Sequence, residues 1–358
     1  MVRSSVIESL ADRVTEFYRH RTDEPLERRP YFVLDGASFI YLFDGEPAST
    51  EFVAEIIDGP SIQRQIGATT VRHARLIGLL APIFPRLDRT TLPVPSSLAP
   101  DVIIRRSRYN VFDLDRGDVC KFPIDDDGDI RAEIDARESV PKSVPTPETL
   151  EIDRTFPFVR ETIVDGRSVP LSMDSWPYIF EALRSLEPLY RSDRLNYRST
   201  DELLEPHRKR DDRTIQRACS YLEDLSLPDR LSVGRIHGDL APRNLRYTDD
   251  RVHIFDWQDY RRGLLIDDFF NPLYRIGTHL DHPEIFYRMV VGEGTPQRIA
   301  QEYSSELGMF AFENDRFYEG LPLLYLLDRS RFEEGRLVGS HSRLLRGVVE
   351  LLDESPPF

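Results

Sequence analysis

The chain has 358 residues, 40% of them hydrophobic and 30% charged, which is a globular composition long enough for two or three folded units. Its net charge of −15 argues against nucleic acid as a partner, because phosphate backbones are bound by clustered positive charge. The sequence predicts a cytoplasmic protein with no membrane span, since it has no long apolar run and no apolar signal-peptide core near its start. Its 2 cysteines are too few for a disulfide framework or a cysteine zinc site.

Lysine is scarce, because only Lys121, Lys142 and Lys209 are lysines among 47 basic residues. An acidic, arginine-rich surface is typical of proteins that work in concentrated salt, where the Debye length falls to about 3 Å and self-repulsion costs little. We therefore predict a halophilic source. A GC-rich genome that favours arginine codons is the alternative explanation for the scarcity of lysine.

Residues 1–97 are predicted to form an α/β extension of unknown role. Apolar residues recur at helical spacing over 4–20, which indicates an amphipathic helix. The stretch 32–43 predicts a hairpin with an Asp-Gly turn, and a further helix is expected over 70–80. Three prolines then predict a linker over 92–100, because proline breaks helices and interrupts sheet ladders.

The next segment, 98–168, is predicted to form a small β-rich unit. Strand-like residues over 102–115 lead through a turn at Arg116 and Gly117 into a strand that contains Lys121. A compact ammonium group on a strand suits a pair of phosphates, and arginine would be bulkier and geometrically different. Lys121 is therefore a candidate for holding nucleotide phosphates.

A short helix is expected over 130–138, after an acidic loop that lacks the full ligand pattern of a calcium-binding EF-hand. This helix offers Glu133 and Glu138 as alternative ion-pair partners for Lys121. Beyond residue 168 the periodicity is mainly helical to the end of the chain.

The strongest pattern is His237-Gly-Asp239-Leu-Ala-Pro-Arg-Asn244, followed by Asp256 at the end of a hydrophobic strand. In phosphoryl transfer, one aspartate orients or deprotonates the attacking hydroxyl, while an asparagine and a second aspartate hold Mg²⁺ against the nucleotide phosphates. Either motif alone has a real false-positive risk. Their order, spacing and strand context together indicate a kinase site.

These motifs resemble those of the aminoglycoside phosphotransferase and choline-kinase-like family, where His-Gly-Asp and Phe-Asp-Trp are usual. The resemblance covers roughly residues 101–358 and implies an α+β, protein-kinase-like fold with a small lobe (98–168) and a helical large lobe (169–358). It implies an ATP- and Mg²⁺-dependent phosphotransferase that acts on an alcohol group. One departure is that the segment 106–110, expected to cover the phosphates, has no glycine.

The resemblance also assigns roles to individual residues. Asp239 is the expected catalytic residue, and Asn244 and Asp256 are the expected Mg²⁺ ligands. Glu133 is favoured over Glu138 as the partner of Lys121, because the Val-Pro-x-Pro sequence of the family then follows at 144–147.

The strand and hinge that join the two lobes are expected near Glu161 and Ile163, which makes these two residues candidate nucleotide contacts. His237 and Asp268 are predicted to brace the catalytic loop. Arg243 is left open between a phosphate contact, an anionic-substrate contact and a surface arginine.

The Asp-Leu-Ala-Pro-x-Asn version of the loop looks like a subgroup associated with surface glycan biosynthesis, which suggests a sugar or lipid-linked sugar hydroxyl as acceptor. A protein Ser/Thr kinase is one alternative, although little chain separates Asp256 from Asp268 for an activation segment. A catalytically silent pseudokinase scaffold is the other, although Lys121, Asp239, Asn244 and Asp256 are all present.

Overall fold

The computed structural model places the chain in two compact units. One comprises Met1–Arg137 with Pro147–Ile163, and the other comprises Glu138–Thr146 with Val164–Phe358. The structure describes residues 2–355, with the exception of 35–38, 43–50, 53–86, 303–317, 330–337 and the single positions 106, 126, 193, 195, 297 and 300. Among the described residues, no helix is both long and apolar enough to cross a membrane.

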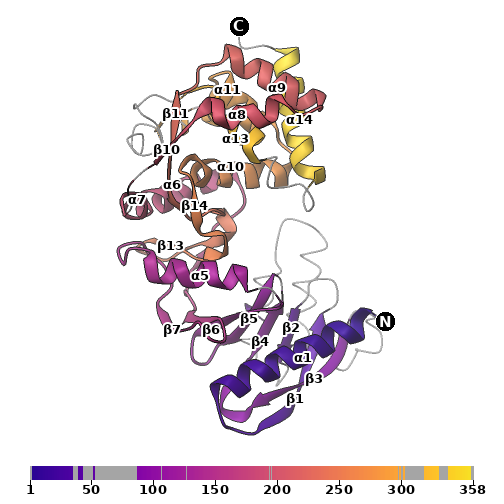
Figure 1. The fold of residues 1–358 in the computed structure, drawn as a ribbon. Helices are drawn as coiled ribbons and strands as arrows, with labels where there is room; N and C mark the ends of the chain where they lie inside the picture. Colours follow the sequence, from indigo (N-terminus) through magenta and orange to yellow (C-terminus); the bar gives the residue numbers. More distant parts are fainter. Residues whose placement is uncertain are drawn as a thin grey trace. The chain divides into compact units, whose positions relative to one another are not determined.

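The first unit is built on one eight-stranded sheet in the order β3-β1-β2-β4-β5-β6-β8-β7. All neighbouring strands pair antiparallel. Figure 1 labels the strands β1 to β7 of this sheet. The strands are β1 (Leu26–Leu34), β2 (Phe39–Leu42), β3 (Leu87–Pro95), β4 (Val102–Arg105), β5 (Arg108–Asp113), β6 (Asp118–Pro123), β7 (Thr149–Asp153) and β8 (Phe158–Thr162). The short helix α5 (Gly128–Ser139) connects β6 to β7.

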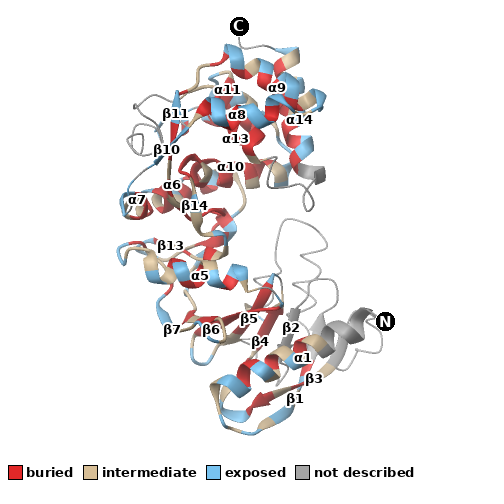
Figure 2. Cartoon of the chain, viewed as in Figure 1, coloured by how far each residue is buried: buried red, intermediate tan, exposed pale blue. Residues whose placement is uncertain are grey.

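Helix α1 (Val2–Arg21) confirms the helix predicted over 4–20, and it packs on the sheet. Its buried positions Leu10, Val14 and Phe17 recur at intervals of four and three residues, which places them on one face. Figure 2 colours the buried residues of the chain red. The Phe17 ring stacks on Phe122 of β6 at a centroid distance of 4.3 Å. The helix and the sheet therefore share one hydrophobic core.

The N-terminal residues are part of this sheet. The predicted hairpin strands are confirmed by the pairing of β1 with β2, while its Asp-Gly turn and the helix expected over 70–80 lie outside the described residues. The linker predicted over 92–100 is wrong in its first part, because β3 extends to Pro95. Proline is tolerated there because, among the described strands, β3 lies at the edge of the sheet, where a missing N–H breaks no ladder on the open side. The sheet thus continues across residue 97.

The second unit is mainly helical, with two small antiparallel sheets, β10-β11-β14 and β13-β12-β9. The helices are α6 (Trp176–Ser185), α7 (Glu187–Arg191), α8 (Thr200–Arg208), α9 (Arg213–Asp224), α10 (Ile266–Leu280), α11 (Glu284–Val290), α13 (Leu321–Arg329) and α14 (Val338–Glu354). The strands are β9 (Arg167–Ser168), β10 (Asn196–Ser199), β11 (Arg230–Ile236), β12 (Leu245–Tyr247), β13 (Val252–Ile254) and β14 (Arg261–Leu264). A β-rich unit followed by a helical one confirms the predicted α+β class.

Candidate active site

The predicted catalytic loop, residues 237–244, begins where β11 ends and is held by one buried carboxylate. Asp268 is fully buried in the first turn of α10. The backbone N–H groups of His237 and Gly238 each donate to one of its oxygens, at 2.9 Å. The Tyr190 hydroxyl donates to Asp268 Oδ2 at 3.1 Å. Asp268 is therefore the anchor that the sequence predicted.

Gly238 adopts a left-handed conformation with φ +85°. A Cβ atom at this position would collide with the Asp259 carbonyl and with the Arg261 side chain. Only glycine has the conformational freedom and the space that this turn requires. The tight turn brings the backbone of the loop close to the Asp268 carboxylate.

His237 braces the loop, as predicted. Its Nδ1 accepts the backbone N–H of Asp239 at 3.3 Å, so that Nε2 holds the proton and donates to the Phe255 carbonyl at 3.1 Å. The ring also packs on Trp257 at a centroid distance of 4.6 Å. The imidazole thus connects the loop to the segment that contains the second predicted aspartate.

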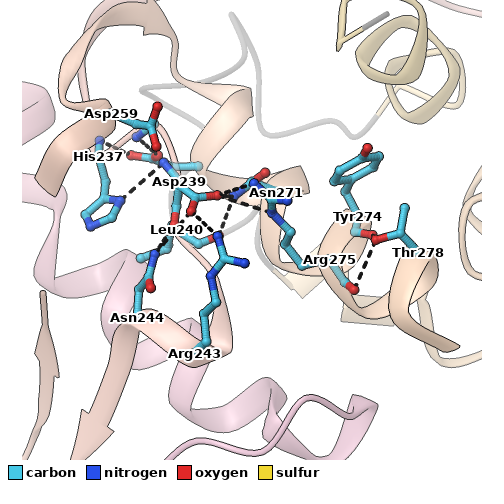
Figure 3. Close-up of polar contacts among 12 residues, drawn as sticks. His237, Asp239, Leu240, Arg243, Asn244, Asp259, Asn271, Tyr274, Arg275 and Thr278 are labelled. Carbon is cyan, nitrogen blue, oxygen red and sulfur yellow. Dashed lines mark hydrogen bonds and ion pairs between the residues drawn. The ribbon is translucent and has the colours of Figure 1, made fainter. Parts of the chain in front are cut away.

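The Asp239 side chain is only 3% exposed, and both of its carboxylate oxygens accept hydrogen bonds from neighbouring side chains. Oδ1 accepts from Arg275 Nη2 at 2.7 Å and from Asn271 Nδ2 at 3.1 Å (Figure 3). Oδ2 accepts from Arg243 Nη2 at 2.6 Å and from Asn244 Nδ2 at 3.3 Å. The carboxylate therefore has a fixed orientation.

The charge state of Asp239 follows from these contacts. Burial raises the pKa of the carboxyl group, but the charges of Arg275 and Arg243 outweigh burial and hold the pKa well below its usual range. A group that is ionised at all ordinary pH values is a weak proton acceptor. The geometry suits a side chain that orients a hydroxyl through a hydrogen bond.

Asn244 and Asp256 are brought together by the backbone. Asn244 is buried at the end of a short 3-10 helix (Pro242–Asn244), and its backbone carbonyl accepts the N–H of Phe255 at 3.1 Å. Asp256 follows at once in a left-handed conformation with φ 67°, which is rare outside glycine and is often found at functional sites.

The two side chains provide the hard oxygen atoms that Mg²⁺ prefers. Among the described residues, no group of three or more His, Cys, Asp and Glu side chains could hold a metal by itself. A pair of protein ligands completed by phosphate oxygens is the usual arrangement for Mg²⁺ in a phosphotransferase. The residues present therefore fit a metal that is bound together with a nucleotide.

The first unit contains a separate buried ion cluster around Lys121. Lys121 Nζ lies 2.7 Å from Glu133 Oε1 and also pairs with Glu161. Arg108 donates to Glu133 Oε2 at 2.5 Å, and Arg137 pairs with both glutamates. Burial raises the pKa of Glu133, but the three cations outweigh burial and hold it well below its usual range.

Of the two glutamates proposed as the partner of Lys121, the structure shows Glu133, because Lys121 pairs with Glu133 while Glu138 is exposed. The cluster gives Glu161 a role in the sheet that the sequence did not predict. The Ile163 N–H donates to the Gly117 carbonyl at 2.7 Å, so this donor is already engaged within the unit. Nucleotide binding by Glu161 and Ile163 stays a prediction.

Sequence reasoning missed Asn271 and Arg275, which hold Asp239, and Arg108 and Arg137, which hold Glu133. In α10, positions 268, 271 and 275 lie on one face, because three and seven residues correspond to about one and two turns. Helical spacing from Asp268 is therefore the signal that could have identified Asn271 and Arg275 from the sequence.

The family model of the phosphotransferase enzyme family matches residues 171–300. No curated protein matches the chain. Among solved structures, a choline/ethanolamine kinase family protein from Mesorhizobium loti is similar at 14% identity, with a TM-score of 0.42 over 71% of this chain and 87% of that chain.

The amicoumacin kinase hAmiN, solved with AMP-PNP, Ca²⁺ and Ami, gives 13% identity and a TM-score of 0.40 over 71% of this chain and 88% of that chain. The choline kinase LicA from Streptococcus pneumoniae gives 11% identity and a TM-score of 0.37 over 69% of this chain and 91% of that chain. These sequence identities and TM-scores are too low to carry an argument, so the family match alone is used, and only for the residues that it covers. Residues 171–300, which include the catalytic loop and α10, thus have the sequence of the phosphotransferase enzyme family, and the resemblance predicted from the motifs is confirmed over this segment.

Proposed function

We propose that the chain is an ATP- and Mg²⁺-dependent phosphotransferase that transfers a phosphoryl group to a hydroxyl of a small molecule. The observation that supports this most is the orientation of Asp239, a carboxylate fixed by four side chains in a loop anchored on Asp268. Phosphoryl transfer depends mainly on alignment and charge stabilisation, which a fixed carboxylate provides.

The roles of the residues follow from their chemistry. Asp239 accepts a hydrogen bond from the acceptor hydroxyl and directs its oxygen at the terminal phosphorus of the nucleotide. Asn244 and Asp256 hold Mg²⁺, which neutralises charge on the phosphate oxygens when it is bound. Lys121, held by Glu133 at 2.7 Å, binds nucleotide phosphates. The use of a nucleotide also agrees with the AMP-PNP present in the similar amicoumacin kinase structure.

Two substitutions test this function. Asp239→Asn should lower kcat by about a hundredfold and leave the affinity for Mg·AMP-PNP unchanged, because the side chain orients the acceptor. Asp256→Asn should abolish metal-dependent nucleotide binding. Asp250→Asn is the matched control, since Asp250 is an exposed aspartate in the turn between β12 and β13. Calorimetry measures binding, and ADP formation with a panel of acceptors measures turnover.

Full turnover by the Asp239→Asn variant, or unchanged Mg·AMP-PNP affinity in the Asp256→Asn variant, would contradict the proposal. The unfolding transition of each variant should match that of the wild type, so that a loss of activity reports on chemistry.

Within this function we favour a sugar or lipid-linked sugar of glycan biosynthesis as acceptor, for which the Asp-Leu-Ala-Pro-x-Asn loop is the support. The chain between Asp256 and Asp268 forms a short 3-10 helix (Trp257–Asp259), β14 and the start of α10, which leaves little room for the activation segment of a protein kinase. An acceptor panel of sugars, aminoglycosides and a generic protein distinguishes these cases. Phosphate on the protein alone would reject the sugar, and no turnover with ATP still bound would indicate a scaffold.

A further inference from the structure

Two arginines flank the carboxylate that faces the acceptor in the proposed function. Arg275 Nε and Nη2 both donate to Asp239 Oδ1, at 3.2 and 2.7 Å, while Arg243 Nη2 donates to Oδ2 at 2.6 Å (Figure 3). Asp239 brings one negative charge and the arginines bring two positive charges. The three side chains together therefore have a net charge of +1.

The two guanidinium groups differ in exposure. The Arg243 side chain is 53% exposed and that of Arg275 is 20% exposed, whereas Asp239 is buried. A guanidinium has five N–H donors, and the described residues use one of them on Arg243 and two on Arg275. Donors therefore remain for a ligand that enters from solvent beside Asp239.

The neighbouring carboxylates are mostly engaged elsewhere. Asp268 accepts the backbone N–H groups of His237 and Gly238, and Asp267 pairs with Arg261 at 3.3 Å. Asp256 and Asp259 are the other carboxylates of this region; burial raises the pKa of Asp259, and the charges of Asp239 and Asp256 raise it further. With Asp256 assigned to Mg²⁺ in the proposed function, Arg243 and Arg275 keep donors that no described carboxylate uses.

We infer that the acceptor is an anion, a hydroxyl compound with a carboxylate or phosphate group that Arg243 and Arg275 bind. This inference rests on the proposed function and specifies its substrate class. Guanidinium groups match the geometry of carboxylate and phosphate oxygens and form strong, charge-assisted hydrogen bonds with them. An acceptor with an ammonium group would meet two like charges at the same place.

The arrangement also shows how the acceptor hydroxyl reaches Asp239. Oδ1 is fixed by Arg275 and Asn271, both on α10. Oδ2 is held by Asn244 and by the more exposed Arg243. An anionic group that draws Arg243 towards itself frees a site on Oδ2, and the hydroxyl of the same molecule can then donate to it.

The test uses acceptors that share a skeleton and differ in charge, such as glycerate with glycerol, and gluconate or glucose 6-phosphate with glucose and glucosamine. The wild type should prefer the anionic member of each set in kcat/KM. Comparison of the carboxylates glycerate and gluconate with glucose 6-phosphate shows whether the site prefers a carboxylate or a phosphate group. Arg243→Gln should raise KM for the preferred anion about 10- to 100-fold, and by clearly more than it raises KM for the neutral member, which loses only the hold of Arg243 on Asp239 Oδ2.

Arg243→Lys should restore part of the preference, because the charge returns without the planar donor geometry. Arg191→Gln is the matched control, since Arg191 is also 53% exposed and also pairs with an acidic residue four positions away. It should change neither KM nor kcat.

A wild type that prefers neutral or cationic members would overturn the inference and leave the proposed function intact, as would an Arg243→Gln variant that loses both classes equally. If no acceptor is phosphorylated, the same compounds are titrated calorimetrically against the protein with Mg·AMP-PNP. Anion binding that Arg243→Gln abolishes supports the site, and no anion binding overturns it. A failure of the proposed function itself appears separately, as a loss of Mg·AMP-PNP binding.

Discussion

At the scale of the residue, adjacent aspartates in the first turn of α10 occupy opposite electrostatic situations. Asp268 is fully buried and accepts two backbone N–H groups of the catalytic loop. Burial and the carboxylates of Asp328 and Asp268 raise the pKa of Asp267 to about 7, although Arg261 lowers it. Asp268 thus accepts fixed backbone donors, while Asp267 is close to half protonated at neutral pH.

We predict that Asp268→Asn lowers the free energy of unfolding by about 2–4 kcal/mol, because an amide cannot accept two N–H groups with two carboxylate oxygens. It should also reduce turnover, since the loop that positions Asp239 loses its anchor. Asp267→Asn is the control and should cost less than about 1 kcal/mol, because Asn resembles the protonated acid. Urea unfolding at pH 7 compares the two, and equal losses would contradict the assignment.

The raised pKa of Asp267 predicts a pH dependence of stability. The unfolded carboxyl has a pKa of about 3.9 and the folded one about 7, so the folded state binds one more proton between these values. This contribution to stability is complete below the unfolded pKa and declines as the pH rises to about 7, by at most about 1.4 kcal/mol per pH unit. Unfolding of the wild type and Asp267→Asn from pH 5 to 8 measures the difference, and parallel profiles would refute it.

At the scale of the element, the sheet of the first unit joins strands on both sides of residue 97. We predict that a chain without residues 1–97 loses the cooperative fold of this unit, because α1 no longer covers Phe122 and Phe158 of the shared core. Near-UV circular dichroism and binding of an apolar dye measure the loss. A deletion that keeps a native spectrum would show that these residues form a dispensable extension.

A milder substitution separates packing from truncation. Phe17→Ala should cost about 3–5 kcal/mol, since a fully buried ring that stacks on Phe122 is removed. Asp12→Ala, at an exposed position of the same helix, is the matched control.

Local sequence patterns predicted individual helices and strands better than they predicted which elements pack or pair with one another. The spacing of Leu10, Val14 and Phe17 was enough for α1, because a helix face is recorded in nearby residues. The strand β3 was missed because proline is tolerated only at a sheet edge, and the edge is defined by strand order across the whole unit. The same limit applies to the site, where motifs identified Asp239 but not Arg275, since their contact joins segments distant in sequence.

At the scale of the whole molecule, the balance of 62 acidic against 47 basic side chains predicts a stability that rises with salt. Between about 0.1 M and 1 M KCl the Debye length falls from about 10 Å to about 3 Å, which screens repulsion among surface carboxylates. Tm should therefore increase with KCl by more than it does in sucrose of equal osmolality. A Tm that is flat or falls with KCl would argue against a halophilic adaptation and in favour of the codon explanation for the scarcity of lysine.

The prolines of β3 have a consequence for encounters between copies of the chain. An edge strand presents unpaired N–H and C=O groups on which a strand of another molecule can add. Among the described strands, β3 has a partner on one side only. Pro93 and Pro95 lie two residues apart in it, and because proline has no N–H, both fit positions whose N–H would face the other side. Along this half of β3 an incoming strand would find acceptors without the matching donors, so the sheet resists growth by intermolecular strand addition.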